Sequence, residues 1–222
     1  MKNTILVIAP HPDDETLGLG GTLLRRGFEG HKLFWLIATS MSKNSEWSQK
    51  KIDRRKEQIK ECTKFYNFSQ VYELNQPAAQ LDSIPLHILV KKFTTIFQEC
   101  KPNQIYVPHR GDVHSDHRVI FDVVSSCSKA FRFNFIKQIF AYETLSETNY
   151  GLNRDIYFKP NVFVNISDYI DNKIKAINIY EDEMADFPFP RSEKAIRALA
   201  NLRGSSSGFF AAEAFELLVQ RD

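Results

Sequence analysis

The stretch Thr4-Ile5-Leu6-Val7-Ile8-Ala9, followed at once by Pro10-His11-Pro12-Asp13-Asp14-Glu15, decides the fold of this 222-residue chain. Its first six residues form a short, mostly apolar run that ends at a proline, which predicts a buried strand. Residues 16–28 predict a helix with three glycines in its first half. Each glycine lowers helix propensity by about 1 kcal/mol, so we expect these positions to allow the helix to pack closely against a neighbouring segment.

Strands alternate with helices along the rest of the chain. Further strands are predicted at residues 32–38, 71–74, 104–107, 138–142 and 161–166, and further helices at 51–65, 84–99 and 115–124. We expect the last 55 residues to be mostly helical, with breaks at 187–190 and 204–208 that are either surface turns or a mobile rim over a site. The alternation predicts βαβ units and a mainly parallel sheet covered by helices on both faces.

Composition limits the class of protein. A chain of 222 residues, 43% of them hydrophobic, suffices for one core but not for two full domains, so we expect residues 1–222 to form a single domain. The net charge of +2 gives no support to a nucleic-acid partner. No run approaches the roughly 20 apolar residues of a membrane span. Three cysteines without C-x-x-C spacing are typical of a reducing compartment, which predicts a cytoplasmic protein.

Two loops at predicted strand ends share an unusual composition. One is the segment 11–15 and the other is 109–117, and together they hold four of the six histidines, each near carboxylates. Ligands of open α/β sheets bind outside the carboxyl ends of the strands. Imidazole and carboxylate without thiolate form the ligand set of a catalytic zinc or related divalent ion. The sequence therefore predicts a catalytic metal site at this edge of the sheet.

The consecutive acids Asp13 and Asp14 suggest a division of roles. Neighbouring carboxylates repel, so their proximity is costly unless something separates what they do. A metal does this: His11 and Asp14 can converge on one ion while Asp13 stays free as a base beside the metal-activated water. Alone, this motif is more often a turn with an Asp helix cap.

The second loop offers a similar division. His117 can be the third ligand, and Asp116 can orient His114, as carboxylates commonly do for imidazoles near a metal. Ser115 and Asp116 can also simply cap the following helix. Because both motifs stand at strand ends of one sheet, we favour a site over two unrelated caps.

These residues resemble the LmbE/PIG-L family of zinc-dependent de-N-acetylases. The resemblance is carried by residues 9–15, by Gly18-x-Gly20-Gly21-Thr22 and by His114-Ser115-Asp116-His117. Weaker matches extend it along nearly the whole chain, namely Arg55-Lys56-Glu57, residues 159–166, Lys173 with Ala176 and Tyr180, and Ala212-Glu213-Ala214-Phe215.

The resemblance implies a Rossmann-like three-layer α/β fold and hydrolysis of an N-acetyl or other N-acyl group from an amino sugar or sugar conjugate, such as a derivative of N-acetylglucosamine. It implies one Zn²⁺ per chain, or Fe²⁺ or another divalent ion in its place, held by His11, Asp14 and His117. The partner is then a small N-acetylated sugar conjugate, and the oligomeric state, a homo-oligomer included, stays open.

Roles of the remaining residues follow from the same resemblance. Asp13 corresponds to the general base, and His114 to the group that stabilises the oxyanion and protonates the leaving amine. Asp116 corresponds to the partner that orients His114. Arg55 corresponds to a substrate-facing arginine. Arg54 is the alternative for this role, because the helix register is uncertain by one residue.

The chain departs from the family where Asp182-Glu183 replace a frequent Ser-Gln. This change lies outside the expected metal centre, so it concerns substrate identity rather than the chemistry. Nearby, Ser192 is expected to cap a helix, with contact between Arg191 and substrate as the alternative.

Other functions compete with deacetylation. A nucleotide-binding oxidoreductase is disfavoured because Leu23 stands where the dinucleotide fingerprint needs a third glycine or alanine. A metal-dependent phosphoester hydrolase also uses His and Asp clusters, but a two-metal site needs more ligands than the two loops readily supply. A non-catalytic metal-binding interaction protein has no need of a free carboxylate at Asp13.

Overall fold

The computed structural model describes residues 2–41, 47–153 and 155–222. Within these residues, seven strands form one sheet in the order β3-β2-β1-β4-β5-β7-β6. Their bounds are β1 (Thr4–Ala9), β2 (Lys32–Ser40), β3 (Gln70–Pro77), β4 (Gln104–Pro108), β5 (Gln138–Tyr142), β6 (Val162–Asn165) and β7 (Ala212–Gln220).

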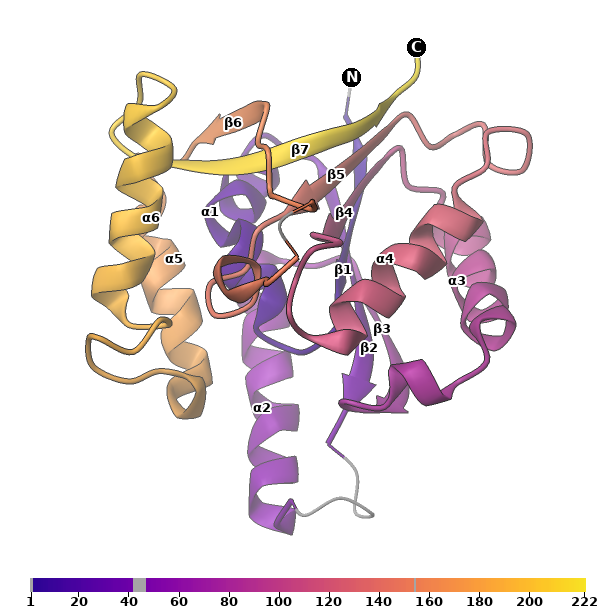
Figure 1. Cartoon of the computed structure of the whole chain (residues 1–222), viewed down its shortest axis with the longest axis horizontal. Coiled ribbons are helices and arrows are strands. Elements are labelled where there is room, and N and C mark those ends of the chain that lie inside the picture. Colours follow the sequence, from indigo (N-terminus) through magenta and orange to yellow (C-terminus); the bar gives the residue numbers. More distant parts are fainter. Residues whose placement is uncertain (1, 42–46, 154) are drawn as a thin grey trace.

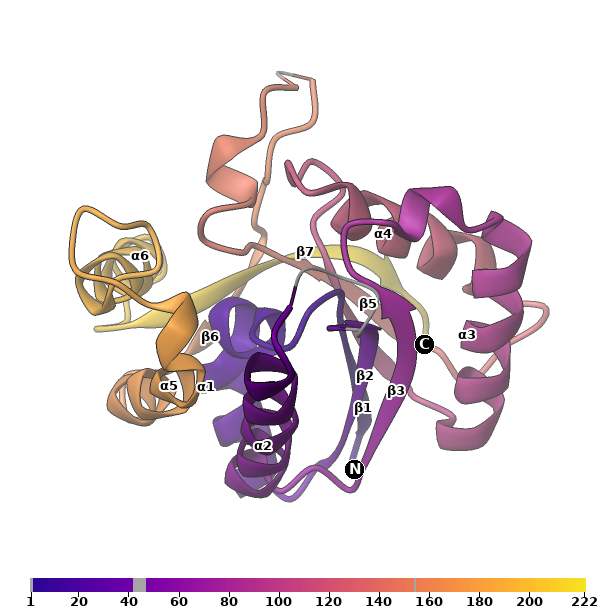
Figure 2. The ribbon, with the colours of Figure 1, turned by 90° about the horizontal axis from the view of Figure 1, so that it is seen from below.

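Helices cover both faces of the sheet. The α-helices are α1 (Asp14–Phe28), α2 (Gln49–Tyr66), α3 (Leu86–Cys100), α4 (Ser115–Cys127), α5 (Ile170–Ile177) and α6 (Glu193–Ser205), with short 3₁₀ turns η1 (Leu81–Ser83), η2 (Thr148–Tyr150) and η3 (Asn178–Glu183). Helices α3 and α4 lie on one side of the sheet, and α1, α2, α5 and α6 lie on the other (Figures 1 and 2). The predicted three-layer α/β fold is confirmed. None of the helices that the structure describes has the length and apolar character that a membrane crossing requires.

The order of the strands determines where a ligand can bind. Strand β1 pairs in parallel with β2 on one side and with β4 on the other, and the chain passes through β2 and β3 before it returns to β4. The connections that follow β1 and β4 therefore leave the sheet in opposite directions. A crevice opens at such a switch point, outside the carboxyl ends of the strands.

The C-terminal segment corrects one expectation. Residues 212–220 form strand β7, which pairs antiparallel with both β5 and β6, so the last 55 residues are not mostly helical. Ala, Glu and Leu dominate this segment and favour a helix by intrinsic propensity. Because β7 lies between two other strands, sheet pairing overrides that propensity. Its first four residues are all buried, so the alternation typical of a half-exposed strand is missing there.

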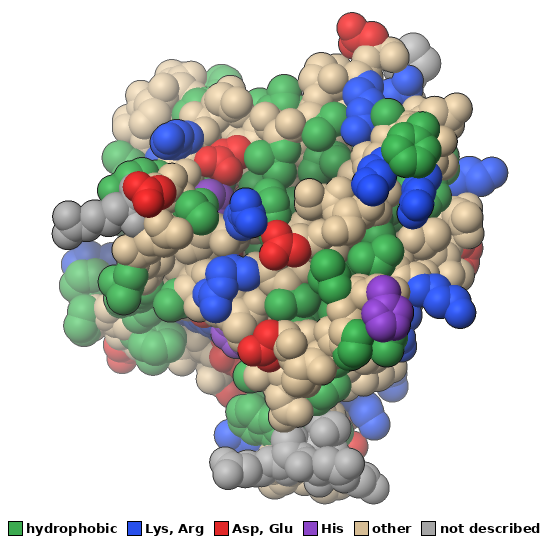
Figure 3. Space-filling model, turned by 45° about the vertical axis from the view of Figure 1, so that its right-hand side comes forward, with side chains coloured by type: hydrophobic (Ala, Val, Ile, Leu, Met, Phe, Trp, Pro, Cys, Tyr) green, Lys and Arg blue, Asp and Glu red, His purple; other side chains and the backbone are tan. Residues whose placement is uncertain are grey.

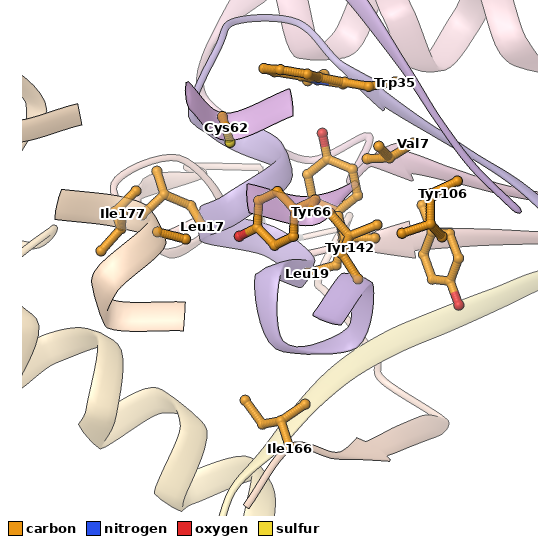
Figure 4. Close-up of a cluster of buried hydrophobic side chains, with 14 of the residues drawn as sticks. Val7, Leu17, Leu19, Trp35, Cys62, Tyr66, Tyr106, Tyr142, Ile166 and Ile177 are labelled. Carbon is orange, nitrogen blue, oxygen red and sulfur yellow. The ribbon is translucent and has the colours of Figure 1, made fainter. Parts of the chain in front are cut away.

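The core on the α1 side explains the glycines of that helix. Figure 4 shows Leu19 of α1 beside Tyr142 of β5 and Leu17 beside Ile177 of α5, in the same buried cluster as Val7 and Tyr106 of the sheet. A Cβ atom at Gly18 would lie 2.3 Å from the ring of Tyr142. The close packing predicted from the sequence is thus present, with an aromatic side chain as the neighbour.

A buried ion pair supports α1 where its backbone departs from helical geometry at Leu19 (φ −147°, ψ 26°). The carboxylate of Glu213 accepts hydrogen bonds from the N–H groups of Gly21 (2.9 Å) and Thr22 (2.6 Å). The Nζ of Lys173 donates to Glu213 (2.6 Å) and to the carbonyl oxygen two residues before the kink (2.8 Å). The backbone groups freed by the kink are therefore paired, and α1 is anchored below the loop that carries Asp13 and Asp14.

Candidate active site

The loop after β1 has an unusual backbone at Asp13. Its φ of 135° lies in the region that non-glycine residues rarely adopt. The buried carboxylate of Glu15 holds this conformation, because its Oε2 accepts the N–H of Asp13 at 3.0 Å. Glu15 also accepts hydrogen bonds from Thr16 (2.7 Å) and Tyr180 (3.0 Å). Such strain is typical of functional sites whose surroundings fix the geometry.

His11, Asp14 and His117 meet at the switch point. The Oδ2 of Asp14 lies 3.3 Å from the Nδ1 of His11 and 3.3 Å from the Nε2 of His117. The Nε2 of His117 is buried and has no hydrogen-bond partner among the described residues. A buried polar atom without a partner is costly, and two imidazoles with one carboxylate are a donor set suited to a divalent ion. These three residues therefore fit a metal.

Asp112 fixes the orientation of His117, although the sequence reasoning gave it no role. Its Oδ2 lies 2.8 Å from the Nδ1 of His117, and its Oδ1 accepts a hydrogen bond from the hydroxyl of Thr148 at 2.6 Å. A carboxylate at Nδ1 selects the tautomer whose Nε2 carries a free lone pair. In the neutral ring, which is the form that binds a metal, this lone pair lies on the side of Asp14. The signal in the sequence was an aspartate five residues before His117 in the same loop.

Asp116 is placed differently from the expectation. Its carboxylate accepts hydrogen bonds from the N–H groups of Ala79 (2.7 Å) and Leu81 (3.0 Å) and lies 3.0 Å from the Nε2 of His11. It therefore orients His11 rather than His114. The contact with His114 is made by the backbone N–H of Asp116, which donates to Nδ1 at 3.1 Å. Since α4 begins beside His114, the backbone reaches that ring before the carboxylate can.

His11, His114 and Asp116 form a second group whose ligand atoms lie close enough for an ion. Backbone N–H groups engage both oxygens of Asp116, whereas the one backbone donor to Asp14, the N–H of His11 at 2.9 Å, engages Oδ2 only, so the group with Asp14 is the better donor set. For His114, the hydrogen bond to Nδ1 leaves the proton on Nε2. Burial, together with the charges of His11 and His117, lowers the pKa of His114 to about 4. The ring is neutral near pH 7 and is a hydrogen-bond donor through Nε2.

Asp13 stands beside this group with one oxygen paired. Its Oδ2 accepts a hydrogen bond from the Nη1 of Arg191 at 2.8 Å. Burial raises the pKa of Asp13 to about 7, against the opposing charge of Arg191 and with a further increase from Asp14. A carboxylate with a pKa near 7 is suited to accept and return a proton at neutral pH.

A cavity of about 280 Å³ opens above these residues. It is lined by His11, Pro12, Asp13, Thr39, Ser40, Met41, Trp47, Arg55, Ala78, Ala79, His114, Glu147, Glu183 and Arg191. Arg55 is buried and donates to the carbonyl oxygen of Pro12 at 2.7 Å. Arg54 instead points outward and pairs with Glu181 at 2.8 Å. Of the two arginines left open by the helix register, Arg55 is thus the one that faces the cavity.

Ser192 and Arg191 have separate roles in the structure. Ser192 caps α6, since its hydroxyl accepts the N–H of Ala195 at 3.2 Å. Arg191 reaches into the cavity, where it also binds Ser146 at 2.8 Å. The two alternatives considered for this dipeptide are therefore compatible, and the segment 187–192 borders the site.

The stretch 6–128 of the chain matches the model of the PIG-L family, described as GlcNAc-PI de-N-acetylase. The chain belongs to this family. The match confirms the resemblance and identifies the chain as an enzyme of the deacetylase type. A diacetylchitobiose deacetylase of Thermococcus kodakarensis is 26% identical over 219 residues, which cover 94% of this chain and 80% of the relative.

Solved structures share the fold of this PIG-L family member. The N,N'-diacetylchitobiose deacetylase of Pyrococcus horikoshii has a TM-score of 0.77 at 22% identity, with 97% of this chain and 83% of that chain covered. GalB, the 4-carboxy-2-hydroxymuconate hydratase of Pseudomonas putida KT2440, has a TM-score of 0.78 at 14% identity, with 100% and 98% covered. Because a hydratase is among these neighbours, the fold alone does not determine the reaction.

The surface of the PIG-L family member carries both signs of charge. On the face drawn in Figure 3, acidic and basic side chains lie near one another, and histidines are visible among them. The mixture agrees with the net charge of +2.

Proposed function

We propose that the protein is a metal-dependent hydrolase that removes an N-acetyl group from an amino sugar or sugar conjugate, such as a derivative of N-acetylglucosamine. One observation carries the proposal: Asp14 lies 3.3 Å from both imidazoles, while the adjacent Asp13 turns away toward the cavity and Arg191. The named relative acts on diacetylchitobiose. The proposed ion is Zn²⁺, with Fe²⁺ or another divalent ion as the alternative.

The residues divide the reaction among themselves. When bound to His11, Asp14 and His117, a divalent ion lowers the pKa of water and polarises the acetyl carbonyl. Asp13 takes the proton from the attacking water and returns it to the amine nitrogen as the C–N bond breaks. We thus give Asp13, whose pKa is about 7, the protonation of the amine that the resemblance implied for His114, whose ring is neutral. His114 donates its Nε2–H to the oxygen of the former carbonyl as negative charge develops there, a contact whose loss costs about 3–4 kcal/mol in other enzymes.

Two other functions fit the contacts less well. A two-metal phosphoester hydrolase needs Asp116 as a ligand for a second ion, but the amides of Ala79 and Leu81 hold its oxygens. A non-catalytic metal-binding protein has no use for the strained backbone at Asp13, which a buried Glu15 is required to hold.

The experiment is an activity screen of the zinc-loaded protein against N-acetylated sugars, nucleotide sugars and lipid-linked sugars, with released acetate as the readout. Metal content is measured by elemental analysis. We expect one metal per chain, and Asp13→Asn should keep the metal while kcat falls by about 10²- to 10⁴-fold, as is typical for a lost general base. His117→Ala should lose the metal, whereas His114→Ala should retain it.

The matched control is Asp53→Asn, an exposed aspartate of α2 that binds Gln49. It should leave both metal content and activity unchanged. Full activity of Asp13→Asn would overturn the assignment of the base. Two metals per chain would favour the phosphoester hydrolase.

We also propose a single domain over residues 1–222 and a cytoplasmic location. The three cysteines are buried and unpaired. Free thiols persist in a reducing compartment, so this observation supports the location.

A further inference from the structure

Two arginines face the cavity, and Glu183 lies between them. One carboxylate oxygen of Glu183 bonds the Nη2 of Arg55, and the other lies 3.4 Å from the Nη1 of Arg191. Both guanidinium groups are largely buried, whereas the side chain of Glu183 is 32% exposed.

Groups of the protein already engage both Nη atoms of Arg55 and much of the guanidinium group of Arg191. Besides Glu183, Arg55 binds the carbonyl oxygen of Pro12, and Arg191 contacts the carboxylates of Asp13 (2.8 Å) and Glu147 (3.5 Å). The cavity wall thus holds three carboxylates against two guanidinium groups. An anion that enters must displace Glu183 from its partners or lie beside it unpaired.

We propose that Glu183 determines specificity: it makes the cavity select neutral glycosides of N-acetylated amino sugars over conjugates whose attached group is an anion, such as a phosphate. The inference rests on the proposed deacetylase function and adds the charge of its substrate class. Specificity of this kind arises from a built-in repulsive group as much as from attraction.

Arg55 belongs to two neighbouring hollows, and Glu183 belongs to one of them. Arg55 lines the main cavity and a second hollow of about 230 Å³, and the two hollows share Pro12, Ser40 and Met41 as well. Glu183 lines the main cavity only. A group that is attached to a sugar in the main cavity and lies beside Arg55 would therefore also lie beside Glu183, and its charge would decide whether that contact is favourable.

The test compares two substrates whose attached group is neutral in one and anionic in the other, the methyl α-glycoside of N-acetylglucosamine and N-acetylglucosamine α-1-phosphate. We expect kcat/KM to be at least about tenfold higher for the methyl glycoside, because like charges in contact oppose binding. Glu183→Gln should reduce this ratio by about tenfold or more, since it frees one guanidinium for the phosphate. Glu181→Gln is the matched control, because Glu181 also belongs to η3 but pairs with Arg54 outside the cavity. It should leave the ratio unchanged.

A binding measurement separates the inference from the proposed function. The products, methyl glucosaminide and glucosamine 1-phosphate, are not turned over, so their affinities for the metal-loaded protein are measured by calorimetry. Glu183→Gln should tighten the phosphate about tenfold relative to the methyl compound. If neither substrate is deacetylated, the proposed function fails for them while this shift still supports the specificity role. Equal rates on both substrates in the wild type, or an unchanged affinity ratio in Glu183→Gln, would overturn the inference.

Discussion

Replacing Asp112 by asparagine tests how the protein prepares His117 for a metal. The carboxylate lies 2.8 Å from Nδ1 of His117, and each side chain is at most 1% exposed. Burial removes water as a substitute partner, so the imidazole depends on this contact for its tautomer. Burial lowers the pKa of His117, but the carboxylates of Asp14 and Asp112 outweigh this and raise it to about 10.

The side-chain amide of the asparagine can adopt two orientations, and both weaken metal binding. If its amide nitrogen faces His117, the ring proton moves to Nε2 and blocks the atom that faces Asp14. If its oxygen faces His117, the tautomer survives but the acceptor is neutral, and Thr148 must rotate its hydroxyl away from donating at 2.6 Å. Partners of this kind are typically worth about 10- to 100-fold in metal affinity, which is about 1.4–2.7 kcal/mol. We expect Asp112→Asn to fall in that range.

The assay is competition for Zn²⁺ with a chelator of known affinity, at fixed pH because metal binding releases protons. The control is Asp122→Asn on α4, whose side chain is 50% exposed and pairs with Arg110. It should bind zinc like the wild type. A zinc affinity of Asp112→Asn within twofold of the wild type would refute the reasoning, as would an equal loss in the control.

Two predictions concern stability. In the metal-depleted protein, burial lowers the pKa of His11, but Asp116 and Asp14 outweigh this effect and raise it to about 9. The pKa of His117 is raised to about 10. Because both values exceed the ordinary 6.5, the two protonated histidines stabilise the fold fully below pH 6.5, and this stabilisation is lost as the pH rises through 9–10. The free energy of unfolding by urea should therefore fall between pH 7 and pH 10, by up to about 1.4 kcal/mol per pH unit for each histidine, and a flat profile would contradict it. Separately, Lys173→Met should lower the free energy of unfolding by about 3–5 kcal/mol, because it leaves Glu213 buried without its cation. Lys175→Met, on the exposed side of α5, should lower it far less. Equal losses of the two variants in urea denaturation would count against the role of the pair.

The sequence could predict that His11, Asp14 and His117 lie together as a candidate metal group, because their positions depend on short-range features. His11 and Asp14 directly follow one buried strand, and His117 lies in the first turn of the helix after another. Carboxyl ends of parallel strands share one edge of a sheet, so residue type and strand position together were sufficient. No long-range distance had to be known.

The cavity wall could not be predicted in the same way. Arg191 reaches Asp13 across 178 positions of sequence, and Glu183 meets Arg55 across 128. Such contacts depend on how α5, η3 and the segment before α6 pack against α2, which no local pattern encodes. The predicted partner of Asp116 differs from the observed one for a related reason. His114 lies close to Asp116 in the sequence, but the turn of the backbone directs the carboxylate of Asp116 to His11.

The candidate reaction groups and the groups of the proposed specificity also come from different parts of the chain. His11, Asp13, Asp14, His114 and His117 all lie on the connections of β1 and β4, within the segment that matches the family. Glu183 and Arg191, which line the cavity with Arg55, come instead from the C-terminal half, beyond that segment. Strands of one sheet hold His11, Asp14 and His117 in a fixed relation, whereas Glu183 and Arg191 meet Arg55 and Asp13 through side chains alone. We therefore expect Glu183→Gln to change which conjugate is accepted without moving the candidate metal ligands.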